Sequence, residues 1–137
     1  MNRRTKLSTL SLAKAFVKNL GFKILHENSL VVVPQGQKLN LKRAGRIETD
    51  WSSAAFLMVI GALKGRVSIS GLSAKSLQPD SVVVSLLEKL GATVERPGLV
   101  EKGWLPYPAF EFDVQKSPDL FPVLCVLACF SKGSSKI

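Results

Sequence analysis

Asp119 is the side chain of this sequence that is best placed for acid–base chemistry. It lies in the stretch KSPDLFPVLCVLACFSKG, residues 116–133, and residues 120–130 after it carry no charge. A carboxylate at the start of an apolar helix can be a cap, because it accepts hydrogen bonds from free N–H groups of the first turn, where Pro122 is also tolerated. A carboxylate at the edge of a dry core can instead be a general acid or base. The local sequence leaves both roles open.

The apolar stretch after Asp119 is too short to cross a membrane. Eleven residues of helix, from 120 to 130, span roughly 16 Å, about half a bilayer core, so we expect a helix buried on all sides and no membrane partner. Cys125 and Cys129 lie one turn apart, too close for a usual disulfide, and we expect buried thiols. With a single histidine in the chain, we expect no metal site.

Positive charge is concentrated in the first third of the sequence. Residues 1–46 hold ten Lys or Arg and one acid, whereas residues 47–137 hold nine of each. This asymmetry favours an anionic partner, either nucleic acid or a small phosphorylated molecule, although a solvated basic face would look the same. The basic part offers only Phe16 and Phe22 for stacking on bases, which makes nucleic acid the less suitable partner.

The sequence repeats itself at an offset of about 70 residues. The run KNLG at 18–21 matches EKLG at 88–91, and Asp50, which opens DWSSAAF, matches Asp119. Asp50 and the two serines after its neighbour Trp51 are typical helix-capping residues. The repeat predicts helices over 9–20, 51–63, 80–90 and 119–131.

Short alternating segments between these helices predict a sheet with one solvent-facing side. The expected strands are 22–25, 29–33, 67–69, 92–94, 109–114 and 134–137. The pattern indicates an α/β fold with helices on one side of the sheet. No turn or cap follows the last predicted strand, so we expect the chain to be part of a longer protein. The sequence contains no phosphate loop of the GxGxxG or GxxxxGK[ST] type, and one histidine makes a Ser/His/Asp triad implausible.

Three ordered segments resemble the 3-phosphoshikimate 1-carboxyvinyltransferase (EPSP synthase) family. ETDWSSAAF resembles its Asp-x-Ser-Ser-Ala-Ala helix start, SLQPDSVVVSLLEKLGATV its Gln-Gly-Asp segment, and SPDLFPVL its Pro-Asp-Leu-x-Pro helix. The resemblance is clear over 47–137 and loose over 8–46. One departure is QPD at 78–80, where the family usually has Gln-Gly-Asp.

The resemblance implies repeated βαβαββ units, with helices inside and sheets outside, arranged in two domains. Residues 1–46 would then finish one domain, which is basic, and 47–137 would form part of the second, with the crossover near 47–51. The family's N-terminal Lys-Ser motif and its later Lys-Glu-x-x-Arg motif, which bind phosphate and carboxylate groups, would lie outside this chain. A central fragment of the enzyme, inactive alone and completed by the remaining segments, is therefore expected.

The resemblance also implies the activity. The enolpyruvyl group of phosphoenolpyruvate is transferred to shikimate 3-phosphate, with no cofactor, in the cytoplasmic pathway of aromatic amino acid biosynthesis. Asp119 would be the proton acceptor and would contact substrate, and Ser8 would bind shikimate 3-phosphate, with Ser11 as a rival match. A UDP-amino-sugar enolpyruvyl transferase and a basic RNA- or anion-binding module are the alternatives.

Overall fold

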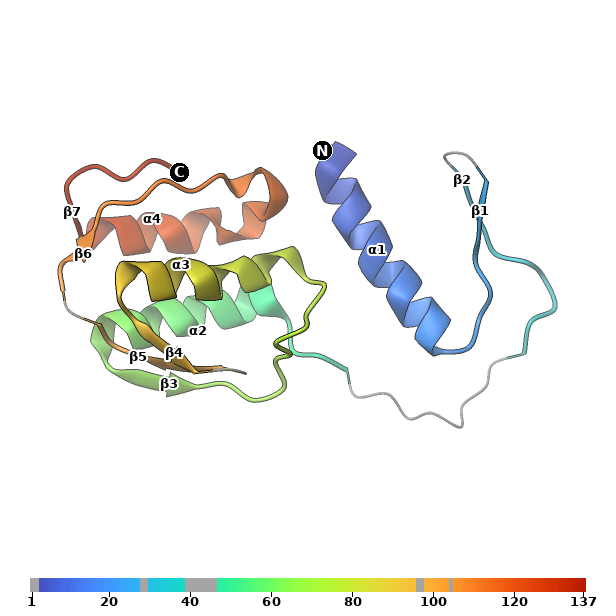
Figure 1. Ribbon diagram of the computed structural model, residues 1–137, viewed down its shortest axis with the longest axis horizontal. Helices are drawn as coiled ribbons and strands as arrows, with labels where there is room; N and C mark the ends of the chain where they lie inside the picture. Colours follow the sequence, from blue (N-terminus) through green and yellow to red (C-terminus); the bar gives the residue numbers. More distant parts are fainter. Residues whose placement is uncertain (1–2, 28–29, 39–46, 96–97, 104) are drawn as a thin grey trace.

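Helix α2 (Trp51–Lys64) is the element around which the folded part of the chain is packed. The computed structural model describes residues 3–27, 30–38, 47–95, 98–103 and 105–137 (Figure 1). Within these ranges, α2 contacts α3 (Val83–Leu90), α4 (Phe121–Cys129) and the strands β3 (Arg66–Ser68) and β5 (Leu99–Glu101). Its inner residues Ala55, Met58 and Ala62 are fully buried.

The helices α2, α3 and α4 run in the same direction, so their starts gather at the end that faces α1 (Arg3–Asn19) (Figure 1). Short 3-10 helices precede two of them: η1 (Pro79–Val82) leads into α3, and η3 (Pro118–Leu120) leads into α4. Both 3-10 helices contact α2. The sequence therefore places the first residues of three helices next to one another.

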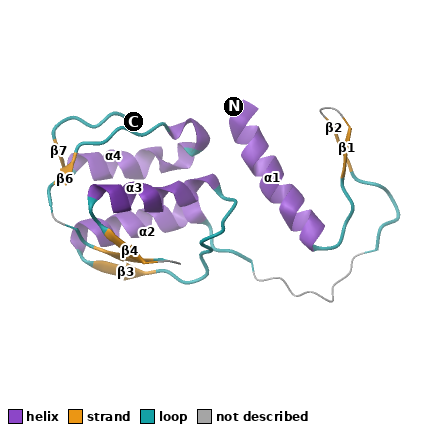
Figure 2. Cartoon of the chain, in the orientation of Figure 1, coloured by secondary structure: helices purple, strands orange, loops and turns teal. Residues whose placement is uncertain are grey.

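Three small sheets complete the fold, and they lie at its edges (Figure 2). An antiparallel sheet has the order β3-β5-β4, with β4 at Thr93–Glu95. The strands β6 (Tyr107–Pro108) and β7 (Ser131–Lys132) pair in parallel. The strands β1 (Leu25–Glu27) and β2 (Leu30–Val32) form a hairpin that belongs to neither of these sheets.

The mixed α/β class is confirmed, and so are the predicted helices to within a few residues, although α1 begins earlier than expected. The strands predicted over 109–114 and 134–137 are wrong: the two segments share one isolated bridge, between Glu111 and Lys136, and the last strand, β7, ends at Lys132. Val114 already begins the 3-10 helix η2 (Val114–Lys116). The central strand β5 was not predicted. The repeated βαβαββ unit stays a prediction.

The hydrophobic core of the described residues is built from residues 51–127. None of the α1 side chains that the structure describes belongs to it; the helix contacts η2, while Leu12 and Phe16 remain exposed. The expectation that α4 is buried on all sides is wrong, because Phe121 and Val126 are exposed, and Cys129 is exposed rather than buried. The physical reason is that no described element packs against this side of α4.

No helix among the described residues is long and apolar enough to span a membrane.

Tyr107 joins the end of α2 to the loop before β6. Its ring is fully buried, and its hydroxyl donates to the Ala62 carbonyl at 2.6 Å and accepts from the Gly103 N–H at 3.1 Å. We predict that Tyr107→Phe lowers the free energy of unfolding by about 1–3 kcal/mol, because it leaves a backbone donor and an acceptor without this partner. Urea unfolding of the chain measures the loss.

Glu111→Gln is the control for Tyr107→Phe. It breaks the exposed ion pair with Lys136 and should change stability by less than about 1 kcal/mol. Equal losses in the two variants would show that the Tyr107 hydroxyl does not anchor this junction.

Candidate active site at the helix starts

The start of α2 is capped as its sequence predicts. Asp50 has extended backbone angles, and its Oδ2 accepts a hydrogen bond from the Ser53 N–H at 2.8 Å. The hydroxyl and the backbone N–H of Ser53 both lower the pKa of the exposed Asp50 carboxyl. The hydroxyl of Ser52, two residues after Asp50, is turned to a different partner, Asp80.

Gln78 ties the start of η1 to the start of α2. Its side-chain oxygen accepts from the Trp51 N–H at 2.9 Å, and its Nε2 donates to the Thr49 carbonyl at 3.0 Å. The side-chain amide of Gln78 thus pairs with one backbone N–H and one backbone carbonyl at the start of α2. These two hydrogen bonds to the backbone hold η1, and with it Asp80, beside the first turn of α2.

Asp80 is the buried carboxyl group of the site. It is 5% exposed, and its Oδ2 accepts a short hydrogen bond from the Ser52 hydroxyl, whereas Oδ1 has no hydrogen-bond partner among the described residues. Burial raises the pKa of Asp80, and the negative charges of Asp119 and Asp50 raise it further. The hydroxyls of Ser52 and Ser117 act in the opposite direction.

Asp119 lies inside the 3-10 helix η3, and its side chain is exposed. Of the two roles that the sequence leaves open for Asp119, the cap is not the one that the structure shows, because Leu120, with helical backbone angles, occupies the N-cap position of α4 and makes no side-chain cap bond. The helix is instead preceded by the turn that Pro118 opens. Asp119 is therefore not engaged as a cap, and it lies close enough to Asp80 for their charges to interact.

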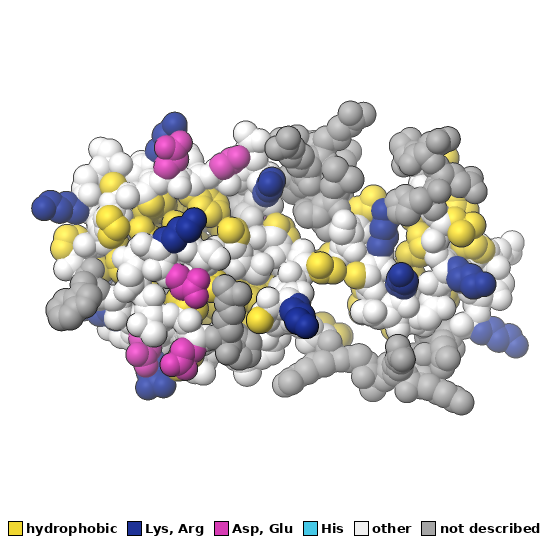
Figure 3. All heavy atoms as spheres, viewed as in Figure 1, with side chains coloured by type: hydrophobic (Ala, Val, Ile, Leu, Met, Phe, Trp, Pro, Cys, Tyr) yellow, Lys and Arg dark blue, Asp and Glu magenta, His cyan; other side chains and the backbone are white. Residues whose placement is uncertain are grey.

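The predicted binding serine is not brought to this site by anything that the structure describes. Ser8 belongs to α1, but its side chain lies outside the described residues, and so its role stays a prediction. Ser11, its rival, also lies on α1 and is exposed. Figure 3 shows Lys and Arg side chains over α1 and around the β1–β2 hairpin, while the Asp and Glu side chains visible in this view all lie on the part of the molecule formed by residues 47–137.

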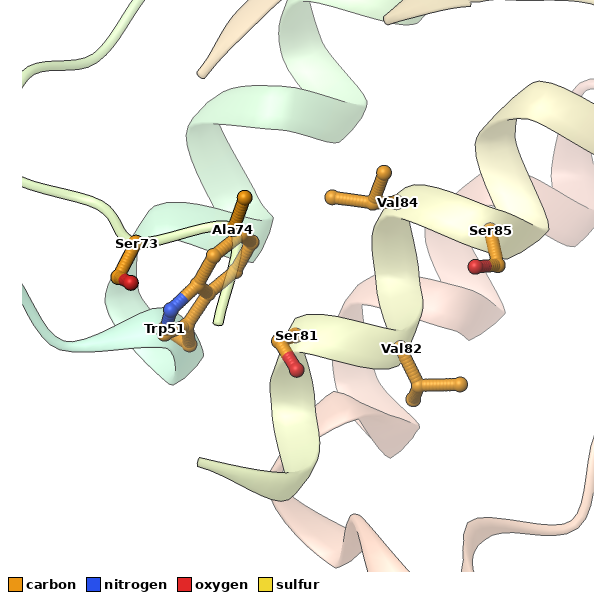
Figure 4. A pocket seen from close by; sticks show the side chains of 7 residues that line it. All are labelled: Trp51, Ser73, Ala74, Ser81, Val82, Val84 and Ser85. Atoms are coloured by element: carbon orange, nitrogen blue, oxygen red, sulfur yellow. The ribbon is translucent and has the colours of Figure 1, made fainter. Parts of the chain in front are cut away.

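A shallow pocket of about 170 Å³ lies on the other side of Trp51, between the loop after β3 and the start of α3. Figure 4 shows Ser73 and Ala74 facing Ser81 and Val84 across it. The residues that line it carry no charge, and its volume is below the roughly 300–1,000 Å³ of typical small-molecule sites. The helix starts around Asp80 and Asp119 are therefore the better candidate site.

The comparison with known proteins gives one family. The sequence profile of EPSP synthase (3-phosphoshikimate 1-carboxyvinyltransferase) matches residues 7–137. The chain belongs to the EPSP synthase family. Relatives named 3-phosphoshikimate 1-carboxyvinyltransferase include proteins from Methanocorpusculum labreanum, 44% identical over 91 residues, and Clostridioides difficile, 32% identical over 129 residues.

These EPSP synthase relatives are much longer than this chain. The matched segments cover 64% of the chain and 21% of the M. labreanum protein, and 93% of the chain and 30% of the C. difficile protein. The chain thus spans less than a third of the curated relatives that it matches. Asp80, the buried acid of the site, was not predicted from the sequence. Its signal was an Asp that directly follows Pro79 and is separated from the apolar run at 82–84 by Ser81.

The raised pKa of Asp80 predicts a pH dependence of stability. The folded chain keeps this proton at pH values where the unfolded chain has released it, so the contribution of Asp80 to stability falls as pH rises from the ordinary Asp range through the raised value. In Asp80→Asn the side chain does not titrate, so this fall in stability with rising pH does not occur. We predict that the variant gains stability relative to the parent chain as pH increases from about 3 to 7.

Asp50→Asn should show the opposite trend in the same urea-unfolding series. The pKa of Asp50 is lowered in the folded chain, so its contribution is present above the ordinary Asp range and is lost as pH falls. The variant should therefore lose stability relative to the parent as pH rises. Parallel trends for the two variants would contradict the assigned environments.

Proposed function

We propose that this chain supplies part of the active site of a 3-phosphoshikimate 1-carboxyvinyltransferase and that Asp119 is its proton acceptor. One observation carries the proposal: the carboxyl group of Asp119 is exposed and does not cap a helix, and it lies near the buried Asp80 at the end where three helices start. The family of the chain supports the reaction type, because the relatives bear the name of this enzyme. The same names favour shikimate 3-phosphate over a UDP-amino sugar as the acceptor.

The chemistry requires a positioned base. A hydroxyl oxygen of shikimate 3-phosphate forms a bond to the central carbon of phosphoenolpyruvate, the hydroxyl proton passes to Asp119, and the methylene carbon takes up a proton to give a tetrahedral intermediate. Loss of a proton and departure of phosphate then yield the enolpyruvyl product. A carboxylate within hydrogen-bond reach of the hydroxyl is suited to the first step. Exposure makes Asp119 accessible to a substrate, whereas Asp80 is enclosed.

Two anionic substrates also require positive charge, and residues 1–46 carry the surplus of the chain. We propose that these residues end one domain and form a basic wall of the cleft, and that residues 47–137 belong to the second domain, built from βαβαββ units. Ser8 is proposed to bind shikimate 3-phosphate. The cytoplasmic location is likewise proposed from the family resemblance alone.

Further segments of the same enzyme are the proposed partners of the exposed apolar side of α2 and α4. Phe56 and Ile60 on α2, and Phe121 and Val126 on α4, are between 43% and 54% exposed. The two helices contact each other, and Lys64 lies 5.4 Å from the ring centre of Phe130 where they end. Large apolar side chains on neighbouring helices favour burial against additional protein.

The catalytic assignment predicts a specific loss in a chimera. The matched segment of the M. labreanum enzyme is replaced by that of this chain, and phosphate release from phosphoenolpyruvate is measured with shikimate 3-phosphate. We expect Asp119→Asn to lower turnover by about a hundredfold or more, because an amide cannot accept the proton. The melting temperature should change little, since the side chain is exposed and makes no cap bond.

Asp50→Asn is the matched control in the same chimera. It also converts an exposed helix-start carboxylate to an amide, and Asn caps a helix about as well as Asp. Turnover should stay near that of the parent chimera. If both substitutions reduce turnover equally and modestly, Asp119 is not the proton acceptor.

The chain by itself should release no measurable phosphate in this assay. It spans about a fifth of the M. labreanum relative, and the family's N-terminal Lys-Ser motif and later Lys-Glu-x-x-Arg motif would lie outside it, so the substrates would not be held in a reactive geometry. Turnover approaching that of an intact relative would contradict the proposal that other segments complete the site.

A further inference from the structure

We propose that residues 48–51 are latched to the loop at 69–78, so that the basic part of the chain can turn relative to the folded part only on the N-terminal side of Glu48. This narrows the crossover expected near residues 47–51 to its first residue or to earlier positions. The inference rests on the proposed division into two domains only for its meaning in the complete enzyme. The latch itself, defined as the hydrogen bonds between 48–51 and 69–78, is a feature of this chain and can be measured without any activity.

Glu48 joins the start of α2 to the loop between β3 and η1. Its Oε1 accepts from the indole Nε1–H of Trp51 at 2.7 Å and from the backbone N–H of Ser73 at 3.1 Å. Trp51 is the first residue of α2 and is 2% exposed, so it cannot move apart from the helix core. Hydrogen bonds to a carboxylate are stronger than those between neutral groups. One side chain thus ties the loop and the core helix to the segment that enters α2.

Thr49 provides the second point of attachment to the loop. Its N–H donates to the Gly71 carbonyl at 2.9 Å, and its hydroxyl donates to the Ser70 carbonyl at 3.0 Å. Gly71 has a φ of +85°, and a Cβ at this position would clash with the hydroxyl oxygen of Thr49. Glycine at 71 therefore permits both the turn of the loop and its close approach to Thr49.

Gln78 attaches the far end of the loop to the same segment, through its bonds to the Trp51 N–H and the Thr49 carbonyl. Among the described residues, five hydrogen bonds then join 48–51 to 69–78. A rotation of the backbone at Thr49 or Asp50 would break several of them at once. Ile47, the residue before the latch, is 84% exposed. Ile47 is therefore the last position at which the chain can turn without breaking the latch.

The latch has a consequence for the proposed enzyme. The start of α2, with Asp50 and Ser52, would keep its geometry while residues 1–46 change position relative to it, because the turning point lies outside the hydrogen-bonded segment. The basic wall and the helix starts could then approach the substrates without loss of the hydrogen bonds that hold the helix starts in place.

The first test inserts two glycines into the full chain, either between Ile47 and Glu48 or between Thr49 and Asp50. The insertion before the latch should leave the midpoint of urea unfolding near that of the parent, because exposed backbone tolerates added residues. The insertion after Thr49 should lower the midpoint, because Glu48 and Thr49 can no longer reach the loop while Asp50 caps α2. Equal midpoints for the two insertions would overturn the inference.

Hydrogen exchange, followed by NMR, tests the role of Glu48 directly. Glu48→Ala removes the acceptor and should speed exchange of the Trp51 indole N–H and the Ser73 amide by about tenfold or more. The amide of Met58, in the middle of α2, should keep its rate and so verify the fold. Glu48→Gln retains a side-chain oxygen that can accept both bonds and should stay near the parent rates.

Glu111→Ala is the matched control. It also removes a glutamate side chain, but one whose ion pair with Lys136 is exposed and lies outside the latch. Both exchange rates should remain at the parent values. If Glu48→Ala speeds the two protons no more than Glu111→Ala does, Glu48 does not hold the latch.

Failure of this inference and failure of the proposed function give different results. Full turnover of the chimera with Asp119→Asn would refute the proton acceptor and leave the latch intact. Equal unfolding midpoints for the two glycine insertions would refute the latch and leave the assignment of Asp119 standing.

Discussion

Close packing around α2 is the constraint on which the rest of the structure depends. Three alanines and Gly61 make up half of its buried residues, and a Cβ added to Gly61 would lie 3.0 Å from the Cβ of Val67 in β3. Such small residues let the strands and the neighbouring helices approach the α2 backbone closely. Because α3 and α4 pack in the same direction as α2, their first turns end up at one end of the molecule.

That end collects the polar groups of the fold. Helix starts carry unpaired N–H groups and a partial positive charge, which stabilise nearby carboxylates. The same packing that brings three starts together also encloses Asp80, however, and burial disfavours its charged form. The site therefore balances two opposing effects: helix ends that favour negative charge, and a dry core with neighbouring acids that favours a proton. The proposed role of this end in proton transfer depends on this balance.

The sequence predicted the helices well because their signals are local. Three such signals act within a few residues: the apolar periodicity, the N-cap Asp50, and Gly91, which ends α3 with left-handed backbone angles. Features that depend on distant residues were missed. Strand β5 has three residues and becomes central only by pairing with β3 and β4. The turn opened by Pro118 shifted the start of α4 past Asp119, and the burial of Asp80 depends on Ser52, 28 positions earlier in the chain.

We propose that the helix starts form the site of proton transfer, with Asp119 facing the substrate. A crystal structure of the chimera with shikimate 3-phosphate bound would test this. We predict a substrate hydroxyl within about 2.6–3.2 Å of an Asp119 carboxylate oxygen, the reach that proton transfer requires. Shikimate 3-phosphate bound elsewhere, for example in the pocket beside Trp51 and Ser85, with Asp119 facing only solvent, would contradict it.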